Sequence, residues 1–395
     1  MSHKEVHAMK EMSSRERVMT TLEHQEPDRV PLDLTITLGA YTRLVKYLGL
    51  ESMVDPEPKI ANWLTYVPID QKVLEALDID IVHLGSRPPK GHPKEFPDGT
   101  TVDEWGVKRR RVERPGGGFY LEMVENPLRD ATIKDLDDYP WPDPHDPAVL
   151  EGLEERIRWW YENTNYAIQV WLERGGLGEQ AGYLRGIEQW WMDLALDKEF
   201  AMALMNRLCD IAIEFNKVCI ELIGKYVNIV RFTGWDLGGQ NGPIFSPSMV
   251  EKMFKPVLKR QWSTVKSFLH NVNPRAKIFF HTCGSVYRLI PTFIECGLDI
   301  LDPLQTTAAG MDMDRIKREF GDKLVFHGAM DIQKIMPFST VDQVKNEVRL
   351  RIRQLAPGGG FILAPAHAFQ DDTPPENIVA MYRAGKEYGR YPIKV

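Results

Sequence analysis

The sequence is poor in cysteine and has no long apolar run. Its four cysteines, among 395 residues, lack the spacing of a disulfide framework, which is typical of a protein from a reducing compartment. No window approaches 18 uninterrupted apolar residues, and the first residues have no apolar signal-peptide core. These absences predict a cytoplasmic protein without a membrane partner.

Positive charge is also scarce. The 56 acidic residues outnumber the 49 lysines and arginines, and the formal net charge is −7. The one short basic run, at residues 108–111, is more typical of a solvated strand or turn than of a phosphate site. Because a nucleic-acid-binding surface needs many basic residues on one face, we expect no nucleic-acid partner.

Eight short apolar runs alternate with helical patterns and polar turns. They span residues 29–36, 79–85, 166–173, 228–236, 277–284, 298–305, 324–331 and 360–368. This alternation is typical of a parallel sheet covered by helices, and eight strands favour a closed (β/α)8 TIM barrel. A doubly wound open sheet is the alternative, but it usually has fewer strands, and no GxGxxG segment follows the first run.

The domain organisation follows from the segments outside this alternation. Ser13 and Glu16 have the spacing of a capping box, which predicts a helix before the first strand. We expect residues 1–12 to be flexible and residues 13–395 to form one barrel domain. Residues 88–146 contain turn signals at Asp98-Gly99 and at glycines 116–118, so they are predicted to be a β-ribbon insertion after the second strand.

A histidine and a cysteine end the fifth apolar run. His281 and Cys283 are two residues apart on a predicted strand, so their side chains should project from the same face. His367, at the end of the last run, is the natural third ligand, and three protein ligands with an open fourth position describe a catalytic zinc. An HxC pair alone is a weak signal, and a buried cysteine beside a hydrogen-bonded histidine is the alternative.

Acidic residues are expected on the same rim, at Asp80, Asp236, Asp302 and Asp331. Each could instead cap a helix, the reading we favour for Asp331. Glu179, in the turn after the third strand, could accept a proton. Since Arg87 and Arg174 are the only nearby arginines that the pattern places, the pocket is predicted to be acidic.

Further residues are candidates for substrate binding. Gln240 lies on a glycine-rich loop and offers an amide donor and acceptor. Trp235 and Tyr183 could form an apolar wall, although such aromatic residues more often belong to the core. For His327 a hydrogen-bonded core position is the competing interpretation.

Four blocks together resemble the uroporphyrinogen decarboxylase superfamily: RERVMTTLEHQEPDRVPLD, DLGGQNGPIFSP, HTCGSVYRLIP and GGGFILAPAHAFQDDTPPENI. That superfamily has the (β/α)8 fold and contains a porphyrinogen decarboxylase and the zinc methyltransferases that serve corrinoid proteins. In many of those methyltransferases an HxCG segment and a last-strand cysteine bind zinc. His281 and Cys283 match the segment, while His367 stands where the cysteine would be, as it does in the decarboxylase. The decarboxylase's RQAGRY-like segment is absent.

The resemblance implies a zinc-dependent methyltransferase, for example one acting in O-demethylation. It would move a methyl group between a small methylated substrate and cobalamin on a separate corrinoid protein, since no cobalamin-binding domain is visible. Asp80, Glu179 and Asp236 would orient or protonate the leaving atom, and the acidic rim favours a neutral or cationic substrate over a porphyrinogen. The alternatives are a metal-free decarboxylase or lyase, in which Asp80 stabilises a cation and His367 contacts a carboxylate, and a non-catalytic ligand-binding barrel. The oligomeric state is open, a homodimer being one option.

Overall fold

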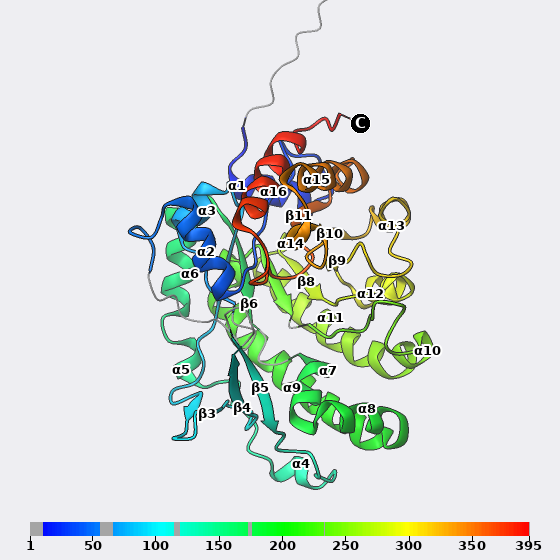
Figure 1. Cartoon of the computed structure of the whole chain (residues 1–395). Coiled ribbons are helices and arrows are strands. Elements are labelled where there is room, and N and C mark those ends of the chain that lie inside the picture. The colour runs from blue at the N-terminus through cyan, green and yellow to red at the C-terminus, as the bar shows by residue number, and fades with distance from the viewer. Residues whose placement is uncertain (1–10, 56–65, 114–118, 173–175, 233, 395) are drawn as a thin grey trace, which may run out of the picture.

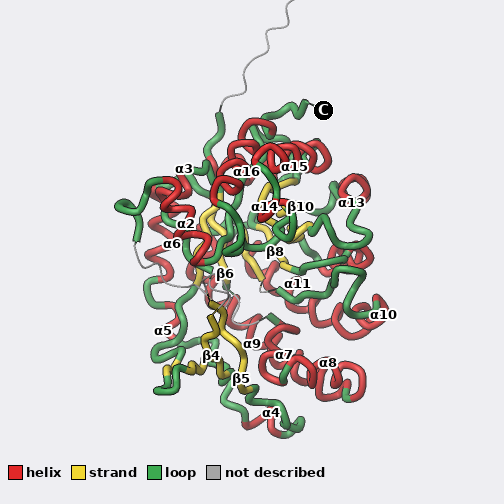
Figure 2. The backbone as a smooth tube through the Cα atoms, in the orientation of Figure 1, coloured by secondary structure: helices red, strands yellow, loops and turns green. Residues whose placement is uncertain are grey.

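A computed structural model describes residues 11–55, 66–113, 119–172, 176–232 and 234–394. Seven parallel strands form one sheet in the order β1-β6-β7-β8-β9-β10-β11. Figure 2 draws strands in yellow, and β6, β8 and β10 of this sheet are labelled there. Their bounds are Ile81–Gly85, Ala167–Trp171, Ile229–Phe232, Lys277–His281, Ile300–Leu304, Val325–Met330 and Phe361–Pro365. Seven of the predicted apolar runs contain these strands, each somewhat longer than the strand itself.

The remaining run, residues 29–36, links the two edges of the sheet. The Leu363 amide donates to the carbonyl of Pro31, and the Asp33 amide donates to the carbonyl of Leu363, both at 3.0 Å. On the other side, the Asp80 amide donates to Leu32 at 2.9 Å. The segment therefore lies between β11, with which it forms an isolated bridge at Leu363, and the start of β1. The sheet thereby curls into a TIM-like barrel.

The helices surround the sheet (Figure 1). Their bounds are α1 Ser14–Leu22, α2 Leu38–Leu48, α3 Gln71–Ala76, α4 Asp135–Asp138, α5 Pro147–Leu150, α6 Leu153–Asn163, α7 Leu177–Arg185, α8 Ile187–Leu196, α9 Lys198–Ile223, α10 Pro247–Met249, α11 Lys255–Val272, α12 Ile290–Cys296, α13 Met313–Phe320, α14 Ile335–Phe338, α15 Val341–Leu355 and α16 Pro375–Tyr388. Short turns η1 Gly224–Tyr226, η2 Val250–Phe254 and η3 Tyr287–Leu289 adjoin them. No helix in these described ranges is long and apolar enough to cross a bilayer.

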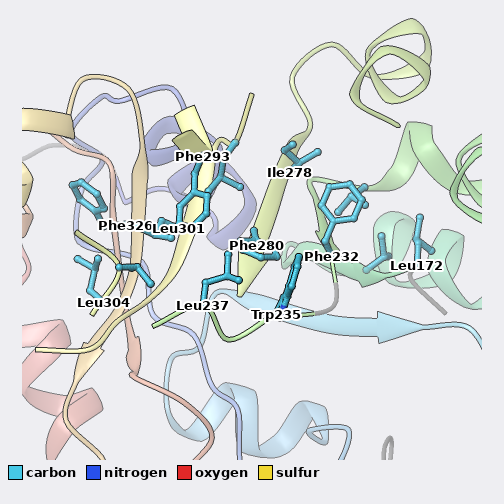
Figure 3. Close-up of a cluster of buried hydrophobic side chains, with 14 of the residues drawn as sticks. Leu172, Phe232, Trp235, Leu237, Ile278, Phe280, Phe293, Leu301, Leu304 and Phe326 are labelled. Carbon is cyan, nitrogen blue, oxygen red and sulfur yellow. The ribbon is translucent and has the colours of Figure 1, made fainter. Parts of the chain in front are cut away.

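The outward-facing strand residues pack against the helices. Figure 3 shows Phe232, Ile278 and Phe280 side by side in this outer core. The ring of Trp262, from α11, lies 4.9 Å from that of Phe280 and stacks on Phe232 at 6.3 Å. Burial of such large rings supplies much of the free energy that holds the helices on the barrel.

The barrel interior has an apolar lower layer. Each of the seven strands contributes one residue to it: Ile81, Ala167, Ile229, Phe279, Ile300, Val325 and Ile362. Val18, Met19 and Leu22 of α1 cover this layer from the amino-terminal end, and α1 begins with the predicted capping box of Ser13 and Glu16. Because side chains alternate along a strand, the residues two positions further on lie one layer higher on the same face. That second layer is polar and contains His83, Gln169, Arg231, His281, Asp302 and His327.

A four-stranded antiparallel sheet follows the carboxyl end of β1. Its strands are β2 Lys94–Glu95, β3 Thr100–Val102, β4 Lys108–Glu113 and β5 Phe119–Glu125. In Figure 1 it projects below the barrel, away from α15 and α16. The turn at Asp98-Gly99 has Gly99 at φ 76°, as that dipeptide predicts, while glycines 116–118 lie outside the described residues. The basic run is strand β4, where Arg110 pairs with Glu122 at 2.8 Å.

Candidate metal centre

His281, Cys283 and His367 converge above the polar layer. One ligand atom from each lies within 4.8 Å of the other two, and His281 Nε2 is 3.3 Å from Cys283 Sγ. His281 ends β8, Cys283 follows two residues later, and His367 lies two residues beyond β11. The structure therefore brings together the three residues that the sequence predicts as metal ligands.

A crossing of two loops holds Cys283 in place. The Cys283 amide donates to Asp236 Oδ1 at 2.8 Å, and the Ser285 amide donates to the carbonyl of Gly239 at 2.8 Å. Gly284, between them, has φ 84°, and a Cβ there would lie 2.3 Å from the carbonyl oxygen of Gly238. Only glycine fits this crossing, because a side chain would collide with backbone atoms.

The protonation of the three side chains suits a cation. Burial lowers the pKa of His367 to about 4, so its imidazole is neutral at pH 7 and has a free lone pair. Burial, together with the Asp236 and Asp302 carboxylates, raises the pKa of the Cys283 thiol well above its usual value. A thiolate is therefore unfavourable here without an added positive charge, and two imidazoles with one thiolate form a donor set that suits zinc.

A chain of alternating imidazoles and carboxylates extends from His281 across the barrel. His281 Nδ1 lies 2.5 Å from Asp302 Oδ2, and Asp302 Oδ1 lies 2.5 Å from His327 Nδ1. His327 Nε2 lies 2.9 Å from Asp33 Oδ2, and Asp33 Oδ1 lies 2.9 Å from His83 Nε2. Asp302 thereby orients His281 so that Nε2 faces Cys283, an arrangement common around protein metal sites.

His327 is the positive centre of this chain. Burial alone would lower its pKa, but the Asp302 and Asp33 carboxylates outweigh burial and raise the pKa to about 9. Both ring nitrogens face carboxylates, so both donate protons and the ring is an imidazolium. The two carboxylates stay ionised: burial opposes this, but the facing histidines hold the pKa of Asp302 and Asp33 far below the usual range.

Other predicted carboxylates lie near Cys283. Asp236 is half-exposed and lies 3.9 Å from His281 Nε2. Glu179, on α7, is close enough to the thiol to contribute to its raised pKa. The hydroxyl of Tyr183 donates to Glu179 Oε2 at 3.3 Å, so this predicted wall residue also supports a carboxylate.

Asp80 corrects one sequence expectation. It precedes β1, is fully buried, and pairs with Arg17 Nη1 at 2.6 Å and Arg29 Nη1 at 2.7 Å. His281, Cys283 and His367, here called the metal trio, lie at the carboxyl ends of the parallel strands. Since the amino ends of these strands lie on the opposite face, Asp80 does not lie on the predicted rim. Its partners come from α1 and the first run, so it ties these elements to the barrel.

Trp235 differs in position from the prediction, whereas Gln240 lies on the predicted loop and its amide group bonds to a neighbouring loop. The indole of Trp235 is 4% exposed and packs on the Phe254 ring at 4.2 Å, so it belongs to the outer core that Figure 3 shows. Gln240 donates to the carbonyl of Thr307 at 2.5 Å and accepts from Gln305 at 3.0 Å, which ties two rim loops together.

Asp331 accepts from three following backbone amides, as the capping interpretation predicts.

Sequence reasoning missed several residues of the polar layer. Asp33, His83, Gln169 and Arg231 each interrupt an apolar run, and the hydroxyl of Tyr66 lies 3.1 Å from His367 Nδ1. A polar side chain inside a strand expected to be buried was the available signal.

The two arginines that the sequence places near the pocket are not seen to line it. Arg174 lies outside the described residues, and Arg87 is exposed and follows β1.

Comparisons with known proteins give relatives for this geometry. Residues 122–388 match the model of the family described as uroporphyrinogen decarboxylase (URO-D). Over 175 residues, 43% of this chain, the sequence is 26% identical to the methylcobamide:CoM methyltransferase MtaA of Methanosarcina barkeri strain Fusaro, and a second M. barkeri MtaA matches equally. The chain spans about half the length of these relatives, 47%.

A solved structure shares the fold over nearly the whole chain. It is a methyltransferase from Methanosarcina mazei, which is 17% identical and superposes with a TM-score of 0.63. The superposition covers 96% of this chain and 99% of that one. At this identity the likeness shows the common barrel, and the chemistry has to be argued from the residues described above.

Proposed function

Because this chain belongs to the uroporphyrinogen decarboxylase family, we propose that it is a zinc-dependent methyltransferase of that family. It would transfer a methyl group between a small methylated compound and cobalamin carried by a separate corrinoid protein. The MtaA relatives are named for methyl transfer between a methylcobamide and CoM, which supports this proposal. A homodimer is compatible with it but is not required.

The observation that carries the proposal is the convergence of His281, Cys283 and His367 within 4.8 Å. When bound there, zinc would act as a Lewis acid toward a substrate oxygen or sulfur. The donor set leaves a fourth position for that atom.

The surrounding residues would fix the ligands. Asp302 accepts from His281 Nδ1–H, so Nε2 keeps the lone pair that a metal needs. Tyr66 positions the ring of His367 through its hydroxyl. The positive charge of His327 offsets part of the negative charge of Asp302. Asp302 can therefore accept the hydrogen bond from His281 while the proton stays on His281.

Proton movement would fall to the carboxylates at the mouth. Asp236 is half-exposed and lies beside His281 Nε2, so it can exchange protons with solvent and with the atom at the fourth position. Glu179, in the first turn of α7, is the second candidate. Both belonged to the predicted catalytic set, whereas Asp80 is no longer part of it.

Metal analysis tests the proposed site directly. We expect about one zinc per chain in wild-type protein and the loss of most of it in Cys283→Ala, since two imidazoles bind zinc weakly. Cys296→Ala is the matched control, because Cys296 is a buried cysteine of α12 outside the trio. Wild-type protein that contains no transition metal and takes up none would exclude the site.

Turnover tests the reaction. Conversion between cob(I)alamin and methylcobalamin can be followed by absorbance with a panel of methyl ethers, methylamines and thiols. Methyl transfer that needs both zinc and Cys283 is the expected result. Binding of ligands without turnover would favour the non-catalytic barrel.

A metal-free decarboxylase is the second candidate, and Arg231 is the observation that favours it. The sequence argument against anionic substrates placed only Arg87 and Arg174 near the pocket, yet Arg231 lies within the barrel, 3.8 Å from Asp302 Oδ2. Decarboxylation of uroporphyrinogen that persists in Cys283→Ala would support this candidate over the methyltransferase.

A further inference from the structure

Two polar side chains of β6 are buried without hydrogen-bond partners. Gln169 is 0% exposed, and both its Oε1 and Nε2 lack a partner within the described part of the chain. The indole Nε1–H of Trp171 is buried and unpaired in the same way. Unpaired buried polar groups cost free energy and are rare, so these atoms are suited to a partner that the described residues do not supply.

Arg231 stands next to them, and its guanidinium makes no hydrogen bond to any residue in the described ranges. It is 9% exposed, and its ion pair is with Asp302 Oδ2 at 3.8 Å, beyond hydrogen-bond distance. The guanidinium lies over the Trp171 ring at 4.4 Å and the Phe279 ring at 4.8 Å, which hold its plane. A guanidinium offers five N–H donors in a planar fork that matches a carboxylate or sulfonate.

Strand register places these groups on one interior wall beside the metal trio. Ala167 belongs to the lower apolar layer, so Gln169 and Trp171 point into the barrel above it. Trp171 pairs with Arg231 in the β6–β7 register. The ring of Tyr66 lies 6.4 Å from that of Trp171, and its hydroxyl reaches His367, so a single aromatic ring separates this wall from the trio.

The interior charge favours an anion. Asp33 and Asp302 are balanced by the His327 imidazolium and Arg231. A divalent cation held by one thiolate and two neutral imidazoles would add one net positive charge. A ligand with a single negative charge would then bring this buried layer to neutrality, the least costly state in a poorly hydrated site, while the Asp236 and Glu179 carboxylates lie at the mouth, partly exposed to solvent.

We propose that Gln169, Trp171 and Arg231 form an oxyanion-binding subsite for the carboxylate or sulfonate of a small substrate whose oxygen or sulfur lies at the metal trio. This proposal rests on the proposed function only where it places the reacting oxygen or sulfur of the substrate at the metal trio. The oxyanion end is argued from the three residues alone. It replaces the expectation of a neutral or cationic substrate, which depended on placing Asp80 at the rim and on missing Arg231. Arg231 supplies charge and a forked donor pair, and Gln169 and Trp171 supply neutral donors.

Binding of matched probes tests the subsite without requiring turnover. Methoxyacetate, 2-methoxyethanesulfonate and the neutral 2-methoxyacetamide would be titrated by calorimetry or ligand-observed NMR. We expect at least one acid to bind about tenfold or more tightly than the amide, as charge-assisted hydrogen bonds predict. The better acid identifies the class of oxyanion.

Variants locate the discrimination. Arg231→Gln should abolish the preference for the acid, and Arg231→Lys should keep part of it, since lysine retains the charge but not the fork. Arg87→Gln removes the same charge from an exposed position after β1 and should keep the wild-type preference. An unchanged preference in Arg231→Gln would overturn the proposal.

Gln169→Met separates a ligand-binding role from a structural one. Methionine has a similar volume and leaves no buried amide unpaired, so the melting temperature should not fall. Acid binding should nonetheless weaken by about threefold or more, the effect of one lost hydrogen bond. A destabilised variant with unchanged acid binding would mark Gln169 as structural and count against the subsite.

A chelated sample distinguishes the two ways in which an acid could bind. If the acid preference disappears on metal removal and survives Arg231→Gln, the carboxylate binds the metal and the subsite is wrong. An acid preference that depends on Arg231, in protein without methyl transfer, would support the subsite and contradict the proposed function.

Discussion

His327 is a buried imidazole with a carboxylate at each ring nitrogen. Its pKa is raised to about 9 by Asp302 and Asp33 despite burial, whereas an unfolded histidine titrates near 6.5. A raised folded pKa stabilises the fold below the unfolded pKa, and this contribution is lost as pH rises through the folded pKa. The relevant window therefore runs from about pH 6.5 to about pH 9.

We expect His327→Gln to be less stable than wild type near pH 6, by a margin that shrinks as pH rises to 10. The pKa difference corresponds to roughly 3 kcal/mol of the margin. Chemical unfolding across this pH range measures it, with His145→Gln, an exposed histidine, as the control. A margin that is constant from pH 6 to 10 would contradict the charged state inferred for His327.

Asp236 permits a second test at the residue scale. Its Oδ1 accepts from the Cys283 amide, and asparagine can keep that acceptor while removing the charge beside His281. Asp236→Asn should lose about a hundredfold or more of the methyl-transfer rate, the usual contribution of a general acid or base. Its unfolding free energy should change by less than ~0.5 kcal/mol.

Asp236→Ala provides the comparison, since alanine removes the acceptor as well as the charge. It should show the same loss of rate and an additional loss of stability of about 1 kcal/mol from the unpaired loop amide. Full activity in Asp236→Asn would show that Asp236 only supports the loop.

At the scale of elements, α1 closes the amino-terminal end of the barrel. Its apolar residues cover the lower layer, and Arg17 pairs with the fully buried Asp80. The same aspartate pairs with Arg29 from the first run. One carboxylate thus joins the helix, the first run and the start of β1, and its function is structural.

We expect Asp80→Asn to lower the unfolding free energy by about 3 kcal/mol or more, because the buried Arg29 loses its counter-charge and Arg17 keeps only its pair with Asp28. Asp78→Asn is the control: Asp78 is 43% exposed and pairs with Lys386, so its loss should cost less than ~1 kcal/mol. Chemical unfolding and zinc content would be measured for both. A stable Asp80→Asn protein that loses only activity would restore the catalytic assignment of Asp80.

At the scale of the whole molecule, the barrel is one body with two kinds of interior. The lower layer is apolar and sealed by α1, and the upper layer is polar and opens toward the metal trio. The antiparallel sheet β2–β5 contacts this upper end, since Arg109 of β4 lies over the ring of Tyr183, which bonds to Glu179. The fold thereby separates the part that supplies stability from the part that would bind a ligand.

The sequence by itself determined seven of the strands, the capping box of α1 and the convergence of His281, Cys283 and His367, whose binding of zinc stays a prediction. Apolar runs, a Ser-x-x-Glu spacing and residues two apart on a strand are local patterns, so their physical causes act within a few residues. His367 was also predictable, because parallel strands end on a common face.

Only the tertiary structure decided which polar residues meet inside the barrel and at which end each lies. Asp33, His83 and His327 come from three separate strands or runs, and their hydrogen bonds depend on closure of the sheet. Asp80 lies just before β1 and therefore at the amino-terminal end of the barrel, where it pairs with Arg17. The pattern of apolar runs gives strand ends only to within a few residues, so it could not place Asp80 at one end or the other. Arg231 likewise lies beside Gln169 and Trp171 because of the register between β6 and β7 and because of the apolar layer below them. Both features depend on contacts between residues far apart in the sequence.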